Sequence, residues 1–170
     1  MKTYLCLIAV CCFLGCTKEG PAGPSGKDGA QDKQITYHFD FPYASQNLEG
    51  FTYLVLAKFD KRNFVGVDSI ILVANPTVED KGSPGTFCLM DVYNLTDDVP
   101  IANSLLSSNR PQDSLNNSTK FYGANTYLQS GNFYSSLPNK EINLGIRIRT
   151  STKGVTAHGA SKCFIILYRR

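Results

Sequence analysis

The stretch Ile142-Asn143-Leu144-Gly145-Ile146-Arg147-Ile148-Arg149 decides the fold class, because large aliphatic residues alternate strictly with polar or small ones. Successive side chains of a β-strand point to opposite faces, so this period of two predicts a strand with one buried face and one wet face. No window of the chain shows the sustained three-and-four spacing of an amphipathic helix, so helices should be rare.

The same alternation recurs along much of the chain and predicts further strands. They are expected at residues 35–41, 53–59, 65–74, 87–95, 99–106 and 121–128, with a loop rich in Ser, Asn and Pro over 107–119. Cys163 to Tyr168 is apolar on both faces, which is typical of an inner strand. We expect this last strand to pair with residues 141–150 as a hairpin around 151–161.

Roughly nine or ten short strands at spacings of about 10–15 residues predict an all-β fold of two antiparallel sheets packed face to face. Jelly-roll connections are the first choice, because the strand number fits and long loops suit crossovers between sheets. An immunoglobulin-like sandwich is the alternative.

Composition limits the classes of function. The chain has 170 residues and a formal net charge of +3, and it shows no basic stripe long enough for nucleic acid. Charged residues make up 18%, below the roughly 25% of typical soluble domains. Small polar and turn-forming residues replace them, which suits an extracytoplasmic β-protein better than a helical enzyme.

The N-terminus reads as an export signal. Lys2 precedes a ten-residue apolar run from Leu5 to Leu14. Ten helical residues rise only about 15 Å, half of a hydrocarbon core of about 30 Å, so the run is too short to span a bilayer. It ends in Phe13-Leu14-Gly15-Cys16, which resembles the lipobox of bacterial lipoproteins. The resemblance implies that residues 1–15 are removed and that Cys16 is lipidated; two or three acyl chains anchor stably where one is marginal.

Glycine recurs every third position at Gly20, Gly23, Gly26 and Gly29. This is collagen spacing, because only Gly fits at the axis of a triple helix. Four triplets are few, so a flexible linker is the first interpretation and a trimeric stalk the alternative.

Together, Phe13 to Gln31 resemble the start of uncharacterised Gram-negative surface lipoproteins, which carry a lipobox, a short Gly-x-y tether and a C-terminal β-sandwich. This resemblance implies a signal peptide over 1–15, a lipidated Cys and tether over 16–32, and a sandwich domain over 33–170. It also implies anchoring in the cell envelope, with the outer membrane as the expected location.

Two cysteines of the domain should point toward the core. Cys88 shares a strand face with Met90, and Cys163 shares one with Ile165. An oxidising compartment permits a disulfide, which would close a loop of roughly 75 residues and contribute about 4 kcal/mol. The alternative is a pair of buried thiols that act as small hydrophobic groups.

Aromatic residues are the better lead to a ligand, since the chain has nine Tyr and ten Phe but no Trp. Tyr122, Phe133 and Tyr134 stand where predicted strands meet polar loops. Aromatic rings beside amides offer the stacking and hydrogen bonds that a sugar-binding face needs. Placement of the same rings in the core or at its rim is the alternative.

Charged groups give weaker signals. Asp97 and Asp98 could hold calcium with nearby carbonyls, but a solvated turn is the simpler interpretation. A row on the expected solvent side, Arg147, Arg149 and Lys153, could meet an anionic ligand or simply form a wet face that guards against edge pairing.

A further signal concerns modification. Asp113-Ser114-Leu115 resembles an acceptor for O-glycans in some Gram-negative envelopes, as does Asp68-Ser69-Ile70 within a predicted strand. Ser114 is the better candidate, because it lies in a predicted exposed loop.

The sequence therefore predicts a non-catalytic, membrane-anchored binding module, with carbohydrate as the first candidate ligand and a protein partner as another. The alternatives are a structural lipoprotein with a trimeric stalk and, third, an envelope hydrolase. With two histidines far apart in the sequence and no recognisable nucleophile motif, we expect no enzyme activity, metal or cofactor. The protein should be a monomer or a homotrimer.

Overall fold

The computed structural model describes residues 33–40, 44–79, 85–111, 127–159 and 162–170. The chain divides into two units, residues 1–31 and 32–170, and every described residue belongs to the second. Helical structure in the described ranges is confined to two 3-10 turns, η2 (Lys61–Asn63) and η3 (Tyr134–Ser136). No helix in those ranges has the length and apolar character needed to cross a membrane.

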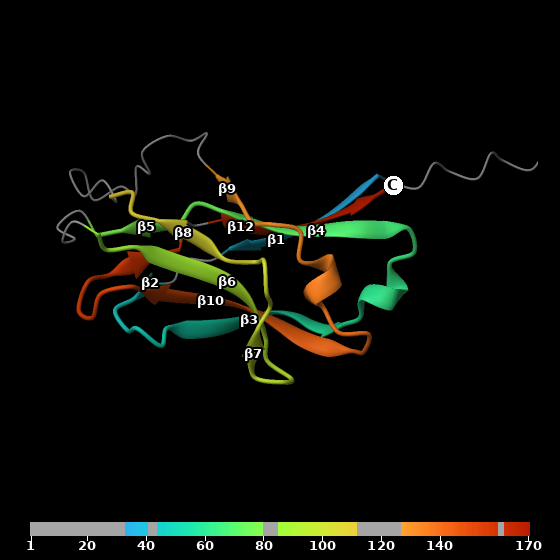
Figure 1. Cartoon of the computed structure of the whole chain (residues 1–170), viewed down its shortest axis with the longest axis horizontal. Coiled ribbons are helices and arrows are strands. Elements are labelled where there is room, and N and C mark those ends of the chain that lie inside the picture. Colours follow the sequence, from blue (N-terminus) through green and yellow to red (C-terminus); the bar gives the residue numbers. More distant parts are fainter. Residues whose placement is uncertain (1–32, 41–43, 80–84, 112–126, 160–161) are drawn as a thin grey trace, which may run out of the picture. The chain divides into compact units, whose positions relative to one another are not determined.

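Two antiparallel sheets form the layers of a sandwich (Figure 1). The first sheet has the order β1 (Gln34–Asp40), β12 (Lys162–Arg169), β4 (Val67–Ala74) and β9 (Leu128–Gln129). The second has the order β3 (Phe51–Phe59), β10 (Ile142–Thr150), β6 (Cys88–Asn94) and β7 (Val99–Pro100), and β8 (Leu106–Ser108) also pairs with β6.

A small third sheet extends the first one. It has the order β2 (Ala44–Ser45), β11 (Ala157–His158) and β5 (Thr77–Val78). In the chain, β2 follows β1, β5 follows β4, and β11 precedes β12. Each of these three pairs therefore counts as one interrupted strand. In the same way, β7 and β8 border successive parts of β6.

Counted like this, the described strands run in the order 1-8-3-6 in one layer and 2-7-4-5 in the other. That is the jelly-roll order; an immunoglobulin domain would instead place its first two strands in one sheet. The predicted two-sheet sandwich is confirmed, and jelly-roll connections are the ones observed.

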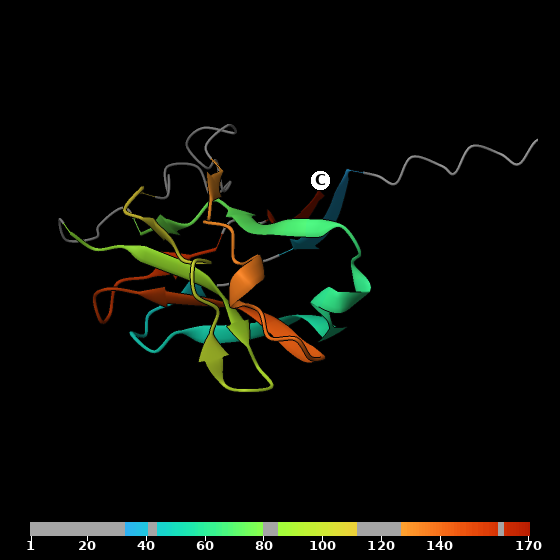
Figure 2. The same ribbon diagram turned by 45° about the vertical axis from the view of Figure 1, so that its right-hand side comes forward.

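The predicted hairpin between residues 141–150 and the last strand is wrong. β10 pairs with β3 and β6, whereas β12 pairs with β1 and β4 in the opposite layer. The chain therefore crosses between layers after Thr150 (Figure 2). Both strands are apolar enough to fill the middle of a sheet, and each occupies the middle of its own.

The strand expected over 99–106 is interrupted. A turn at residues 102–103, with Asn103 at a positive φ of 67°, separates β7 from β8. The Ser104 hydroxyl accepts from the Val92 backbone N–H at 2.9 Å and donates to the Ile101 carbonyl at 2.7 Å. The Ser104 side chain thus supplies the hydrogen-bond acceptor for a backbone N–H of β6 that would otherwise come from a neighbouring strand.

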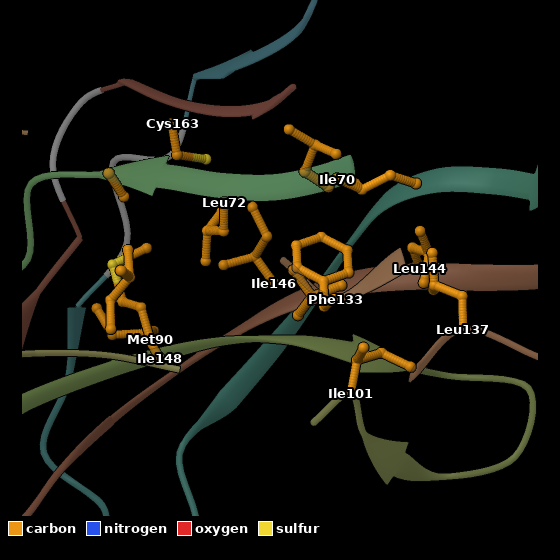
Figure 3. Packing of buried hydrophobic residues seen from close by; sticks show 14 of the residues in the cluster. Ile70, Leu72, Met90, Ile101, Phe133, Leu137, Leu144, Ile146, Ile148 and Cys163 are labelled. Atoms are coloured by element: carbon orange, nitrogen blue, oxygen red, sulfur yellow. The ribbon is translucent and has the colours of Figure 1, made fainter. Parts of the chain in front are cut away.

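The alternation of apolar and polar residues over 142–149 is present in the structure as one buried face and one outer face. Ile142, Leu144, Ile146 and Ile148 are all buried, and they meet Ile70 and Leu72 from β4 of the other layer (Figure 3). Each such side chain contributes about 1.5–3 kcal/mol by leaving water. The core of the described ranges lies between Ile35 and Leu167, within the compact unit formed by residues 32–170.

Candidate functional site

Several residues singled out in the sequence lie outside the described ranges. They are Cys16, Ser114 and Tyr122. The lipid anchor, the O-glycan acceptor and one of the three aromatic ligand-binding candidates therefore stay predictions from the sequence. Ser69 lies in β4 as predicted and is half-buried.

Phe133 is a correction, because it is fully buried and available to no ligand (Figure 3). After β9, the chain continues along the edge of β4: Ser130 and Phe133 donate their backbone N–H groups to the carbonyls of Leu72 and Ile70, at 2.9 and 3.0 Å. The register of these hydrogen bonds turns the Phe133 ring into the core beside Leu137 and Ile101. The polar residues on either side of it face outward and suggested a surface position.

Tyr134 lies half-buried at the rim of the core and is held by a buried lysine. The Lys61 ammonium lies 4.9 Å from the centre of the Tyr134 ring and donates to the carbonyls of Tyr134 and Leu137 at 3.2 and 2.5 Å. Lys61 thus ties η2 to the end of η3 and satisfies carbonyls that the short turn leaves open. These contacts give Tyr134 a structural role.

Cys88 and Cys163 both point into the core, as predicted, and both are free thiols. Of the two alternatives that the sequence left open, the structure has the buried thiols. Burial raises the pKa of each thiol to about 12. The Cys88 thiol lies 3.7 Å from the His158 carbonyl, so it has an acceptor for its weak S–H donor.

Asp97 and Asp98 shape the turn between β6 and β7. Asp97 contacts Lys140 at 2.6 Å and accepts from the Asn94 amide at 2.8 Å, and these bonds, Lys140 first, hold the pKa of its carboxyl below the usual range. Asp98, with a φ of 58°, accepts from the Tyr93 hydroxyl at 3.0 Å. Both carboxylates are engaged by the protein, and the described residues hold no cluster of three or more metal-binding side chains.

A group of exposed apolar residues lies where the chain enters β3. Leu48, Phe51, Tyr53 and Leu54 are between 41% and 51% exposed within seven consecutive residues. We call these four residues the β3 entry surface. Isolated exposed apolar side chains are ordinary, whereas four of them within seven residues make this region a candidate contact surface.

Strand position explains this exposure. Phe51 and Tyr53 pair with Ile148 and Ile146, so their side chains share the core side of the sheet, while Leu54 pairs with Gly145 on the outer side. β3 stands at one end of the described strand order, so the aromatic pair lies at the rim of the sandwich. Residues 51–56 are apolar except for Thr52, so local composition gives no signal of this exposure.

A pocket of about 340 Å³ lies beside this surface. It is lined by Asn47, Leu48, Glu49 and Lys153, from the loops before β3 and after β10. We call it the loop pocket. Its lining combines an amide, a carboxylate, an ammonium group and an aliphatic side chain, and Phe51 follows Glu49 by two residues in the chain. This mixture of a few polar groups with apolar surface is typical of small-ligand sites.

Gly50 brings the two loops together. Its φ is +83°, and a Cβ atom there would lie 2.4 Å from the Ile148 carbonyl oxygen and 2.7 Å from the Arg149 Cβ. The backbone can approach β10 so closely only without a side chain. The neighbouring loop is then fastened by two backbone bonds, from Thr150 to the Asn47 carbonyl and from Gly154 to the Gln46 carbonyl.

The outer face of β10 carries two members of the predicted basic row, Arg147 and Arg149. Arg147 forms a two-pronged ion pair with Asp91, through Nε at 3.0 Å and Nη2 at 2.7 Å, and its guanidinium lies 4.6 Å from the centre of the Tyr93 ring. Hydrogen bonding to Asp91 raises the pKa of Arg147. Arg149 approaches the same carboxylate at 3.6 Å. Lys153 lies apart from this pair, in the loop pocket.

Comparison with known proteins gives little beyond this geometry. No protein-family model matches the chain, and no curated protein is similar to it. Among solved structures, the chain is similar to infectious bursal disease virus proteins: the Gx strain structure at 17% identity, the VP2 subviral particle at 13% and the Gt strain structure at 14%, with TM-scores of 0.38, 0.38 and 0.39. The matches cover 81%, 88% and 88% of this chain, but only 32%, 38% and 37% of those chains.

Proposed function

We propose that this chain is a non-catalytic lipoprotein of the cell envelope whose jelly-roll domain binds carbohydrate at the β3 entry surface and the loop pocket. The anchor is a lipidated Cys16, and the Gly-x-y segment of residues 20–31 serves as its tether. The outer membrane is the expected location. Both parts of this proposal can be tested separately.

The exposure of Phe51 and Tyr53 beside a polar pocket is the observation that carries the binding part. The two rings are 50% and 41% exposed, whereas the residues that they pair with, Ile148 and Ile146, are fully buried. Rings offer apolar faces to the C–H surfaces of a sugar, and the amide and carboxylate of Asn47 and Glu49 offer hydrogen bonds to hydroxyl groups. Leu48 belongs to both the surface and the pocket, so one ligand can touch them together.

The binding part is tested with a glycan array. Soluble residues 33–170 are expected to bind a set of glycans, and the double substitution Phe51→Ala with Tyr53→Ala should remove that binding. Tyr127→Ala is the matched control, since Tyr127 is also 41% exposed but lies beside Phe164 of the other sheet. An array without hits, or equal loss in the control, would refute the carbohydrate assignment.

The anchor is tested by growing cells with an alkyne-tagged fatty acid. The full chain should incorporate the label, and Cys16→Ser should abolish it. Cys6→Ser is the control, because Cys6 lies in the segment that the signal interpretation removes. Labelling that persists in Cys16→Ser would show that this residue is not the acylation site.

A further inference from the structure

Three polar side chains lie side by side across the small third sheet. Gln46 directly follows β2, Thr156 directly precedes β11, and Glu79 directly follows β5. Because β11 pairs with β2 on one side and with β5 on the other, Thr156 stands between the other two residues. Residues that stand opposite each other in neighbouring strands present their side chains on the same face of the sheet.

The hydroxyl of Thr156 connects these side chains. It donates to the Glu79 carboxylate at 2.9 Å and accepts from the Gln46 side-chain amide at 2.9 Å. A carboxylate only accepts hydrogen bonds and a hydroxyl has a single hydrogen, so Glu79 fixes the direction of both bonds. Thr156 itself is buried, and the Glu79 backbone N–H donates to its carbonyl at 2.8 Å. We call Gln46, Thr156 and Glu79 the Thr156 network.

The Thr156 network joins the two loops that form the loop pocket. Gln46 precedes the lining residue Asn47, and Gly154 follows the lining residue Lys153. The Gly154 backbone N–H donates to the Gln46 carbonyl at 3.2 Å, so Gln46 is bonded to the opposite loop through its backbone and its side chain. The described lining of the pocket contains no residue of the network, which therefore acts on the pocket walls from outside.

Hydrogen bonds matter here because the core does not hold the pocket. All four lining residues are exposed, so little buried apolar surface fixes their backbone, and such segments open at low cost in free energy. Gly50 packs against β10 at one end of the loop of residues 46–49. The Thr156 network holds the other end of the same loop.

We propose that Glu79 is a positioning residue for the loop pocket, which holds Gln46 through Thr156 and so keeps the pocket walls in the arrangement that a glycan meets. This inference rests on the proposed carbohydrate function and adds to it a residue that touches no ligand. A pocket whose loops are ordered before binding avoids the entropy cost of ordering them, so it binds more tightly. Breaking the network should weaken binding although every group that contacts the glycan stays in the chain.

The main experiment compares Thr156→Val with Thr156→Ser in the full chain, purified from cells in detergent. Valine has the shape of threonine without the hydroxyl, whereas serine keeps the hydroxyl. Hydrogen–deuterium exchange, read by mass spectrometry, follows the peptides that contain Gly154 and residues 46–50. Calorimetry measures the affinity for the best-binding glycan of the array. We expect Thr156→Val to speed the exchange of both peptides and to weaken binding about fivefold, as for the loss of one hydrogen bond. Thr156→Ser should keep both parent values.

Glu79→Gln tests the carboxylate itself. The glutamine amide has the same length but donates as well as accepts, so it no longer fixes the direction of the Thr156 hydroxyl. We expect faster exchange of the same peptides and binding that is weaker by about two- to fivefold. Thr36→Val is the control, because it removes a bond of the same kind, from the Gln34 amide at 2.8 Å, within β1. It should leave exchange of these peptides and affinity unchanged.

The outcomes separate this inference from the proposed function. Parent values in Thr156→Val or Glu79→Gln, a loss in Thr156→Ser as large as in Thr156→Val, or an equal loss in Thr36→Val would overturn it and leave carbohydrate binding intact. Should Thr156→Val fail to fold, Gln46→Ala replaces it, since Gln46 is exposed; unchanged exchange there would also overturn the inference. A parent chain that binds no glycan refutes the proposed function, and the exchange rates then still decide whether the network holds the pocket walls.

Discussion

Two aromatic pairs of similar composition have opposite positions in this molecule. Phe133 and Tyr134 stand among Asn and Ser residues, and the sequence marks them as surface rings, yet one is fully buried and the other is held by Lys61. Phe51 and Tyr53 stand in a largely apolar strand, yet they are about half exposed. In both cases, the polarity of the neighbouring residues in the chain does not predict the exposure of the rings.

The difference comes from which strand each pair borders. Phe133 lies along β4, where the opposite layer covers it. Phe51 and Tyr53 face the same interior from β3, at the end of their sheet's order. Both pairs stand at an edge of a sheet, so the exposure of each ring is decided by which residues of other segments cover it, and not by its strand face alone.

The strongest test of this comparison is Phe133→Ala. Removing a fully buried ring leaves a cavity, so the free energy of unfolding should fall by about 3–5 kcal/mol. Urea denaturation followed by far-UV circular dichroism measures it. A loss below about 1 kcal/mol would mean that Phe133 is not a core residue.

The pH dependence of stability that the two cysteines cause tests whether water is excluded from the core that contains Phe133. Folding raises the pKa of Cys88 and Cys163 from 9.0 to about 12, so above pH 9 the unfolded chain loses protons that the folded chain keeps. Stability from these groups is present below pH 9 and declines as the pH rises toward 12. By linkage, each thiol should cost about 1.4 kcal/mol between pH 8 and pH 10.

The measurement compares urea unfolding at both pH values in the parent chain and in Cys88→Ala with Cys163→Ala. The difference isolates the thiols from tyrosines and lysines, which also titrate there. A parent chain with the same pH dependence as the double variant would show that water reaches these sulfurs.

Lys61→Ala tests what fixes Tyr134. The substitution leaves the carbonyls of Tyr134 and Leu137 without their donor, so it should cost about 1–3 kcal/mol in the same assay. Lys140→Ala is the control, because Lys140 pairs with Asp97 in an exposed ion pair and should change stability by less than about 1 kcal/mol. Equal effects of the two substitutions would remove the special role of Lys61.

The smallest effect on stability is expected at the β3 entry surface. Phe51→Ala and Tyr53→Ala should each lower the free energy of unfolding by less than about 1 kcal/mol, since these rings already meet water. Differential scanning calorimetry would show nearly unchanged melting. A cost like that of Phe133→Ala would erase the contrast between the two pairs and, with it, the argument for a binding surface.

The sequence by itself determined the strands and their buried faces. Alternation places Ile142, Leu144, Ile146 and Ile148 in the core, and it turns both cysteines inward, because side-chain direction along a strand is a local property. The anchor at Cys16 and the Gly-x-y tether also rest on sequence alone.

Only the tertiary structure decided which strands are neighbours. It placed β10 and β12 in opposite layers, buried Phe133, brought the Gly50 backbone against β10 and formed the loop pocket from residues 47–49 and Lys153. These are contacts between segments some 60 to 100 residues apart in the chain, and a strand's period of two says which side is apolar without saying what will cover it.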